Sequence, residues 1–189
     1  MKLVLGIDPG TAVTGYGVVS LEGRSTALVE CGVIRTNARD PLPQRLHEVH
    51  EGVRELITRH RPDTLAIEDV FYSKNVRTTV VLGHARGVIL LAAQQAALTI
   101  HEYPPAEIKK AVTGRGSASK EQVQFMVGRL LRLKQPPQPA DAADGVAAAL
   151  CACLSVTLPS LPPLNLPSLA SVRAAARTHT TRRSSESRS

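Results

Sequence analysis

Aromatic residues are scarce in this sequence, and it has no long uninterrupted apolar run. Its 189 residues include no tryptophan, two phenylalanines and three tyrosines, so the hydrophobic share of 43% comes mainly from alanine, valine, leucine and isoleucine. That share is enough for a real core at this length. The longest uncharged apolar runs, Val88–Ala93 and Val146–Leu154, are shorter than the roughly 20 residues of a membrane-spanning helix. We therefore expect a one-domain globular chain with no membrane partner.

Cysteine is also rare. Cys31, Cys151 and Cys153 make an odd number in a chain too long to need disulfides for stability. No nearby Cys-x-x-Cys or His-x-x-x-His pair offers zinc ligands. Asp8 interrupts the apolar start of the chain too early for a secretory signal. These features predict reduced cysteines used as small apolar residues, and a cytoplasmic protein.

Positive charge is unevenly distributed along the chain. The net charge is +7, and residues 156–189 carry five arginines and one glutamate, a balance of +4. Leucine and proline alternate at the start of this segment, and the remainder is mainly Ser, Thr, Arg and Ala. Because such a composition cannot bury a core, we predict one folded domain over residues 1–155 and a disordered basic tail over residues 156–189.

Short β-rich or apolar segments alternate with segments of helical periodicity. Strands are predicted over residues 2–8, 14–20, 26–36, 64–68 and 98–103. Helices are predicted around residues 46–57 and over residues 77–97, 107–112, 119–133 and 140–155. We expect the first three strands to form an antiparallel meander, and Ser119 to cap its helix. This order predicts an α/β fold with a mixed five-stranded sheet flanked by helices.

Two acids stand at the ends of predicted buried strands. Asp8 closes the apolar run 2–8, and Glu68 closes the run 64–68. A charge in such a position is costly without a partner, although a single strand-end acid is commonly a cap for the following loop. Two of them at the ends of two central strands favour a functional site.

A third signal is the pair Asp141 and Asp144 at the start of the last predicted helix. Residues i and i+3 share one helix face, so both side chains project from the first turn. Acids there also compensate the helix macrodipole, but one would suffice and two repel. Carboxylates with no lysine paired to them in sequence suit a hard divalent cation, Mg²⁺ or Mn²⁺. Two such ions would stabilise the attacking and leaving oxygens of a phosphoryl displacement.

Five blocks of sequence together resemble the RuvC family, the bacterial Holliday junction endonucleases. The blocks, which occur in order along residues 2–155, are Gly6–Thr11 with Thr14–Gly17, Ala66–Phe71, Gly83–Gly87, Lys109–Lys120 and Ala140–Asp144. The resemblance implies a ribonuclease H-like fold, a homodimer, and metal-dependent cleavage of two symmetry-related strands at a four-way DNA junction. It implies two Mg²⁺ ions per subunit, with Mn²⁺ as a possible substitute, and the branch-migration proteins RuvA and RuvB as partners. The positions that match the family's catalytic, metal-binding carboxylates are Asp8, Glu68, Asp141 and Asp144.

A basic, glycine-rich segment offers candidate DNA contacts. Lys109, Lys110, Arg115 and Lys120 surround the Gly114–Ser117 loop, where backbone amides and a helix N-terminus suit phosphate. A solvated basic loop is the alternative interpretation. The resemblance favours DNA binding, because Lys109 and Lys120 match family lysines important for cutting. We expect Lys120 to touch the scissile phosphate.

Two adjacent aromatic residues follow Glu68. Phe71, with Lys74 and Arg77 nearby, is predicted to stack on unpaired bases at a crossover. A small anchor into the core is the alternative for a loop phenylalanine. Phe71 also matches a family position, whereas the role of Tyr72 is left open.

The helix predicted over residues 77–97 is a candidate subunit interface. Gly83 and Gly87 lie one turn apart and would let a second helix approach closely, and a twofold dimer would match the symmetry of a four-way junction. Packing of this face on the chain's own sheet is the alternative. Gly145, by contrast, is unexpected inside the last helix, because glycine there costs about 1 kcal/mol relative to alanine.

Two other functions remain open from the residues alone. The Asp-x-Gly-Thr motif also resembles the phosphate loop of actin-like ATPases and sugar kinases, but these need two such domains around a nucleotide. A non-catalytic DNA-binding module would not explain four acids beside a polyanion. A structure-selective endonuclease of recombination and repair accounts for more of the motifs than either alternative.

Overall fold

The computed structural model describes residues 1–69 and 76–157 of the chain. The tail from residue 158 onward lies outside this part, as do Phe71, Tyr72 and Lys74. The predicted division at residue 155 therefore stays a prediction.

Within the described residues, the chain forms the succession of strands and helices that the sequence predicts. The elements are β1 (Lys2–Asp8), β2 (Val13–Glu22), β3 (Ser25–Arg35), α1 (Leu42–His60), β4 (Thr64–Glu68), α2 (Val76–Gln95), β5 (Thr99–Tyr103), α3 (Pro105–Thr113), α4 (Lys120–Leu130) and α5 (Ala140–Thr157).

Two helices end earlier than predicted. The helix predicted to reach residue 133 ends at Leu130, and the helix predicted to reach residue 97 ends at Gln95. Each is followed by a residue with left-handed backbone, Arg132 with φ 54° and Ala97 with φ 54°, a conformation that terminates helices. The predicted cap at Ser119 is confirmed: its side chain accepts from the Gln122 amide, and the Gln122 side chain accepts from the Ser119 amide.

All five strands belong to one mixed sheet in the order β3-β2-β1-β4-β5. β1, β2 and β3 pair antiparallel as the predicted meander. β4 pairs parallel to β1, and β5 pairs parallel to β4. The carboxyl ends of β1, β4 and β5 therefore lie at the same edge of the sheet.

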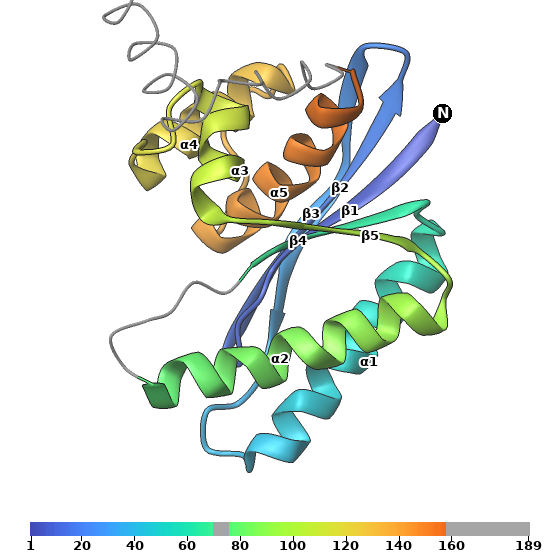
Figure 1. Ribbon diagram of the computed structural model, residues 1–189, viewed down its shortest axis with the longest axis vertical. Helices are drawn as coiled ribbons and strands as arrows, with labels where there is room; N and C mark the ends of the chain where they lie inside the picture. The colour runs from blue at the N-terminus through green and yellow to red at the C-terminus, as the bar shows by residue number, and fades with distance from the viewer. Residues whose placement is uncertain (70–75, 158–189) are drawn as a thin grey trace, which may run out of the picture. The chain divides into compact units, whose positions relative to one another are not determined.

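Helices cover both faces of the sheet (Figure 1). α3, α4 and α5 lie on one face, and α1 and α2 lie on the other. Alternate residues of a strand point to opposite faces. Leu5 and Ile67 accordingly pack with the α1–α2 core, whereas Val4 and Ala66 pack with the α5 core. Two covered faces explain why β1 and β4 are almost continuously apolar.

α5 is the central helix of its layer and contacts all five strands. It can lie this close because glycine faces it at several points. A Cβ added to Gly145 of α5 would lie 2.5 Å from the Tyr16 Cα, and one added to Gly17 would lie 2.6 Å from the Val146 Cα. The glycine that looked unfavourable by helix propensity is thus required by the contact between α5 and β2.

α2 has one core face and one uncovered apolar face. Ala85 and Ile89 are buried in the core that α2 shares with α1, whereas Val80 and Leu91 are about half exposed. By length and composition alone, α2 is the one helix among the described residues that could cross a membrane. The sequence analysis considered only uninterrupted apolar runs, and Arg86 interrupts the apolar sequence of this helix.

We expect Gly145→Ala to destabilise the protein by about 2 kcal/mol, since the added methyl would overlap the Tyr16 backbone. Helix propensity alone predicts the opposite sign, a gain of about 1 kcal/mol. Urea unfolding followed by circular dichroism measures the difference. Gly128→Ala in α4 is the matched control, because its nearest contact would be an ordinary 3.6 Å. An unchanged or raised stability of Gly145→Ala would contradict the proposed close contact.

Candidate metal centre

Two of the predicted acids meet because β1 and β4 run parallel. The register pairs Gly6 with Ala66 and Ile7 with Ile67, so Asp8 and Glu68 follow side by side at the carboxyl ends of the two strands. The turn after Asp8 is held by Thr14, whose buried hydroxyl donates to the Gly10 carbonyl at 2.6 Å.

The other two acids come from the start of α5: Asp141 lies in its first turn, whereas Asp144, predicted to share that turn, follows just after it. Gly15 pairs with Asp8 across the sheet, and a Cβ on Gly15 would overlap the Asp141 backbone. The absent side chain therefore lets the start of α5 lie directly against β2, beside Asp8. One ligand oxygen each from Asp8, Asp141 and Asp144 all lie within 4.8 Å of one another.

Glu68 completes the set from the neighbouring strand. It shares with Asp8 and Asp144 a cavity of about 240 Å³. The cavity is lined by Asp8, Glu68, Pro105, Ile108, Lys109, Lys120, Val123, Asp144 and Ala147. The structure thus brings Asp8, Glu68 and Asp144 to one cavity, with Asp141 beside Asp8 and Asp144, and Lys109 and Lys120 line the same cavity.

Confinement of these acids makes their ionised forms costly. Burial raises the pKa of Asp8 to about 7, and the negative charges of Glu68 and Asp144 add to the rise. Burial also raises the pKa of Glu68, with Asp144 as the second cause. The cavity therefore disfavours an excess of negative charge unless a cation is present.

One lysine already compensates part of this charge. The Nζ of Lys120 contacts the Oδ2 of Asp144 at 2.9 Å, and this hydrogen bond raises the pKa of Lys120. The sequence interpretation that these acids lack a paired lysine holds only for sequence neighbours, since 24 residues separate the pair. Contact of Lys120 with a scissile phosphate stays a prediction.

The remaining predicted DNA contacts are spread over the surface. Lys109 lines the acidic cavity, whereas Lys110 lines a separate cavity with Glu107 and Cys151. Arg115 is exposed on the loop between α3 and α4, and Arg77 is exposed in the first turn of α2. The predictions for Phe71 and Lys74 fall outside the described residues.

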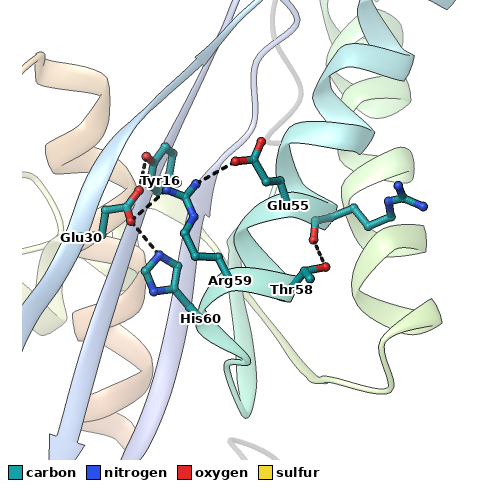
Figure 2. Close-up of polar contacts among 7 residues, drawn as sticks. Tyr16, Glu30, Glu55, Thr58, Arg59 and His60 are labelled. Atoms are coloured by element: carbon teal, nitrogen blue, oxygen red, sulfur yellow. Dashed lines mark hydrogen bonds and ion pairs between the residues drawn. The ribbon is translucent and has the colours of Figure 1, made fainter.

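On the opposite face of the sheet, a polar cluster that the sequence analysis missed joins α1 to the meander (Figure 2). Glu30 of β3 accepts hydrogen bonds from the Tyr16 hydroxyl at 2.8 Å and contacts the His60 Nε2 at 2.7 Å. Arg59 bridges Glu30 and Glu55. Burial would raise the pKa of Glu30, but the hydrogen bonds from Tyr16 and His60 hold it below its usual value. The cluster fixes the end of α1 against β2, the strand next to Asp8.

The donor set of the cavity fits a hard divalent cation. Its ligand atoms are carboxylate oxygens, the type that Mg²⁺ and Mn²⁺ prefer. The two buried cysteines, Cys151 and Cys153, form no disulfide within the described residues and lie in the α5 core, and burial raises the pKa of each. The structure therefore shows an acidic cluster able to bind metal, built from oxygen donors rather than thiols.

Comparisons with known proteins agree over most of the chain. The family model described as "Crossover junction endodeoxyribonuclease RuvC" matches residues 4–152. A protein of that description from Pelotomaculum thermopropionicum is 49% identical over 149 residues, which are 79% of this chain and 91% of the relative. One from Heliobacterium modesticaldum is 44% identical over 155 residues, 82% of this chain and 96% of the relative.

Solved structures show the same fold. The structure of Thermus thermophilus RuvC superposes with a TM-score of 0.76 at 35% identity, over 82% of this chain and 95% of that one. RuvC of the same organism in complex with Holliday junction substrate gives a TM-score of 0.78 at 34% identity, over 83% and 96%. The predicted ribonuclease H-like fold is confirmed by these likenesses. The chain belongs to the RuvC family of crossover junction endodeoxyribonucleases.

Proposed function

We propose that this protein is a structure-selective endonuclease that resolves Holliday junctions during homologous recombination and DNA repair. The reaction is a metal-dependent, symmetrical hydrolysis of phosphodiester bonds in two strands. The observation that carries this proposal is the convergence of Asp8, Asp141 and Asp144 within 4.8 Å, beside Glu68 and two lysines, in a chain of this family. The T. thermophilus relative is described in complex with a Holliday junction substrate.

The four carboxylates are proposed to hold Mg²⁺, two ions per subunit, with Mn²⁺ as a substitute. When bound, such ions activate water for attack on phosphorus and neutralise charge in the transition state. Without a cation, the same carboxylates repel the phosphate that must arrive at the cavity. The acids therefore disfavour entry of a phosphodiester into the cavity until a cation has compensated their charge.

The lysines of the cavity are proposed to attract and orient the phosphodiester. Lys120 starts α4, where the positive end of the helix dipole adds to its charge. Its contact with Asp144 holds the ammonium group beside the carboxylates, and we infer that an arriving phosphate shares this group. Lys109, which lines the same cavity, offers a second cation.

Further contacts to the junction are proposed around the cavity. Lys110 and Arg115 suit backbone phosphates, which give affinity without sequence specificity. Arg77, Lys74 and Phe71 follow Glu68 in the chain, and Phe71 is proposed to stack on an unpaired base at the crossover.

We infer that the active form is a homodimer joined through α2. Its outer face carries Val76, Val80 and Leu91 as exposed apolar residues, and a Cβ on Gly83 or Gly87 would meet no atom within 4 Å. That face is thus not packed on the chain's own sheet, and a second copy would cover it. A twofold dimer would direct two equivalent cavities at two equivalent strands.

Cellular context follows from the substrate class. A bacterial junction nuclease meets its DNA in the cytoplasm, and we propose that location here. The family resemblance further suggests RuvA and RuvB as partners that supply the junction during branch migration.

Replacing Asp8 by Asn tests the catalytic assignment. The change keeps size but removes one anionic ligand, so cleavage of a synthetic four-way junction should fall by several orders of magnitude. Binding of the junction without metal should hold or tighten, since one repulsive charge is gone. Gel assays of nicking and fluorescence anisotropy measure the two effects.

Glu22→Gln is the matched control for Asp8→Asn. Glu22 is an exposed acid at the last residue of β2, whereas Asp8 pairs with Gly15 near the first. Glu22→Gln should cut at the parent rate. Near-parent cutting by Asp8→Asn would contradict the nuclease assignment of this cavity. If the protein were instead a nucleotide hydrolase, Asp8→Asn would abolish ATP hydrolysis and leave junctions unaffected.

The pH dependence of cutting follows from the raised pKa of Asp8, which is about 7. A protonated carboxyl cannot serve as an anionic ligand, so protons and metal compete for the site. At limiting Mg²⁺ the single-turnover rate should rise with pH through about 7, and more Mg²⁺ should move the midpoint to lower pH. A rate independent of pH between acidic and mildly alkaline buffers would contradict this account.

Leu91→Glu tests the subunit interface, because Leu91 is 51% exposed on the outer face of α2. The new charge should leave the fold intact and make the protein monomeric in sedimentation velocity. Val29→Glu is the control, since Val29 is similarly exposed, at 48%, on β3. A dimer that persists in Leu91→Glu, or a monomeric parent protein at high concentration, would argue against this interface.

A further inference from the structure

Arg86 is an isolated charge in the middle of an apolar helix. Between Thr78 and Gln95 it is the only residue with a formal charge at neutral pH. Its side chain is only 19% exposed. An arginine in this environment loses much of its hydration, so it requires compensating partners.

Its partners lie at the carboxyl ends of β4 and β5. The Nη2 atom of Arg86 contacts the Oδ1 of Asp69 at 3.3 Å and forms a close ion pair with the Oε2 of Glu102. The Nε atom is buried and has no hydrogen-bond acceptor among the described residues. One guanidinium group therefore holds two carboxylates, each about half exposed.

Asp69 directly follows Glu68, but the two side chains lie on different faces of the sheet. Glu102 is in register with Ile67, which packs in the α1–α2 core. Glu68 is in register with Tyr103, which packs in the α5 core. Glu68 thus points to the acidic cavity on the α5 face, whereas Arg86 contacts Asp69 on the α1–α2 face of the sheet.

The backbone at this position is tied as well. The amide of Asp69 donates to the Tyr103 carbonyl at 2.8 Å, one residue beyond the end of β4. This hydrogen bond and the Arg86 ion pairs both join the residue after Glu68 to β5. Together they fix the peptide that carries the Glu68 carboxylate.

We propose that Arg86 is a positioning residue, which orients Glu68 toward the metal site by anchoring the Glu68–Asp69 peptide to β5 from the opposite face of the sheet. This inference rests on the proposed function, in which Glu68 is a ligand. Loss of Arg86 leaves Asp69 and Glu102 as neighbouring anions without their shared cation. Their repulsion pulls Asp69 away from β5 and turns Glu68 out of the cavity.

The test uses the full chain with Arg86→Gln, Arg86→Lys and, as a matched control, Arg54→Gln. Arg54 makes an ion pair with Glu51 at 2.9 Å on the same face of the sheet, but its side chain is 64% exposed and lies on α1. Three quantities are measured for each variant. They are hydrogen exchange of the Asp69 amide by NMR, Mn²⁺ binding without DNA by electron paramagnetic resonance, and single-turnover cutting of a four-way junction.

In Arg86→Gln we expect Asp69 amide exchange to be ~10-fold faster and Mn²⁺ binding to be ~10-fold weaker, as for residues that support metal ligands. Cutting should lose a similar factor that added Mn²⁺ partly restores, while junction affinity in Ca²⁺ stays within about twofold. Arg86→Lys should recover part of each loss, and Arg54→Gln should match the parent.

Parent-like exchange and Mn²⁺ binding in Arg86→Gln would overturn the inference even if the protein cuts more slowly. If Arg86→Gln does not fold, Glu102→Gln decides, because it keeps Arg86 but removes the ion pair that joins Arg86, and through it Asp69, to β5. Exchange of the Asp69 amide at the parent rate in that variant would likewise overturn it. A parent protein that binds Mn²⁺ but cuts no junction would refute the proposed function instead, and the exchange and Mn²⁺ results would still decide the role of Arg86.

Discussion

Mutual repulsion among carboxylates at one edge of the sheet is the constraint around which this molecule is built. The parallel pairing of β1 and β4 brings Asp8 beside Glu68, and the contact of α5 with Gly15 adds Asp141 and Asp144. Holding them together raises the pKa of Asp8 to about 7 and also that of Glu68. That cost is offset in part by Lys120 and, on our account, in full when divalent ions bind. The clustered carboxylates thus lower the stability of the metal-free protein, but they form a site that is ready to bind metal.

The two faces of the sheet have different roles: one places the acids, and the other holds the ends of the strands that carry them. On the α5 face, small residues let helix and strands approach until backbone meets backbone, and this places the acids. On the α1–α2 face, polar and charged side chains hold the strands in place. Arg86 contacts Asp69 at the end of β4, and Glu30 with Tyr16 and His60 holds β2 against α1. The outer side of α2 is left apolar and uncovered, so one helix carries both a brace for the site and a candidate subunit contact.

Sequence patterns predicted what depends on near neighbours. The apolar runs of β1 and β4, the Ser119 cap and the spacing of Asp141 and Asp144 are local signals, and each is confirmed in the structure. Contacts between distant segments were out of reach: the Lys120–Asp144 pair, the Arg86 ion pairs, and the need for glycine at position 145. A lone arginine within an apolar helix was the available hint for Arg86. Helix ends were misplaced where Ala97 and Arg132 adopt left-handed backbone that their residue types do not announce.

The most direct measurement of the central claim is the position of strand breaks in a four-way junction with a fixed core, labelled on each strand in turn. With Mg²⁺, the account predicts paired nicks at symmetry-related sites in two strands, with ends that DNA ligase can seal, and no cutting in excess chelator. Cutting that persists in chelator would contradict the role given to the carboxylates. Unpaired nicks, or equal cutting of linear duplex, would contradict a twofold enzyme that recognises junction structure.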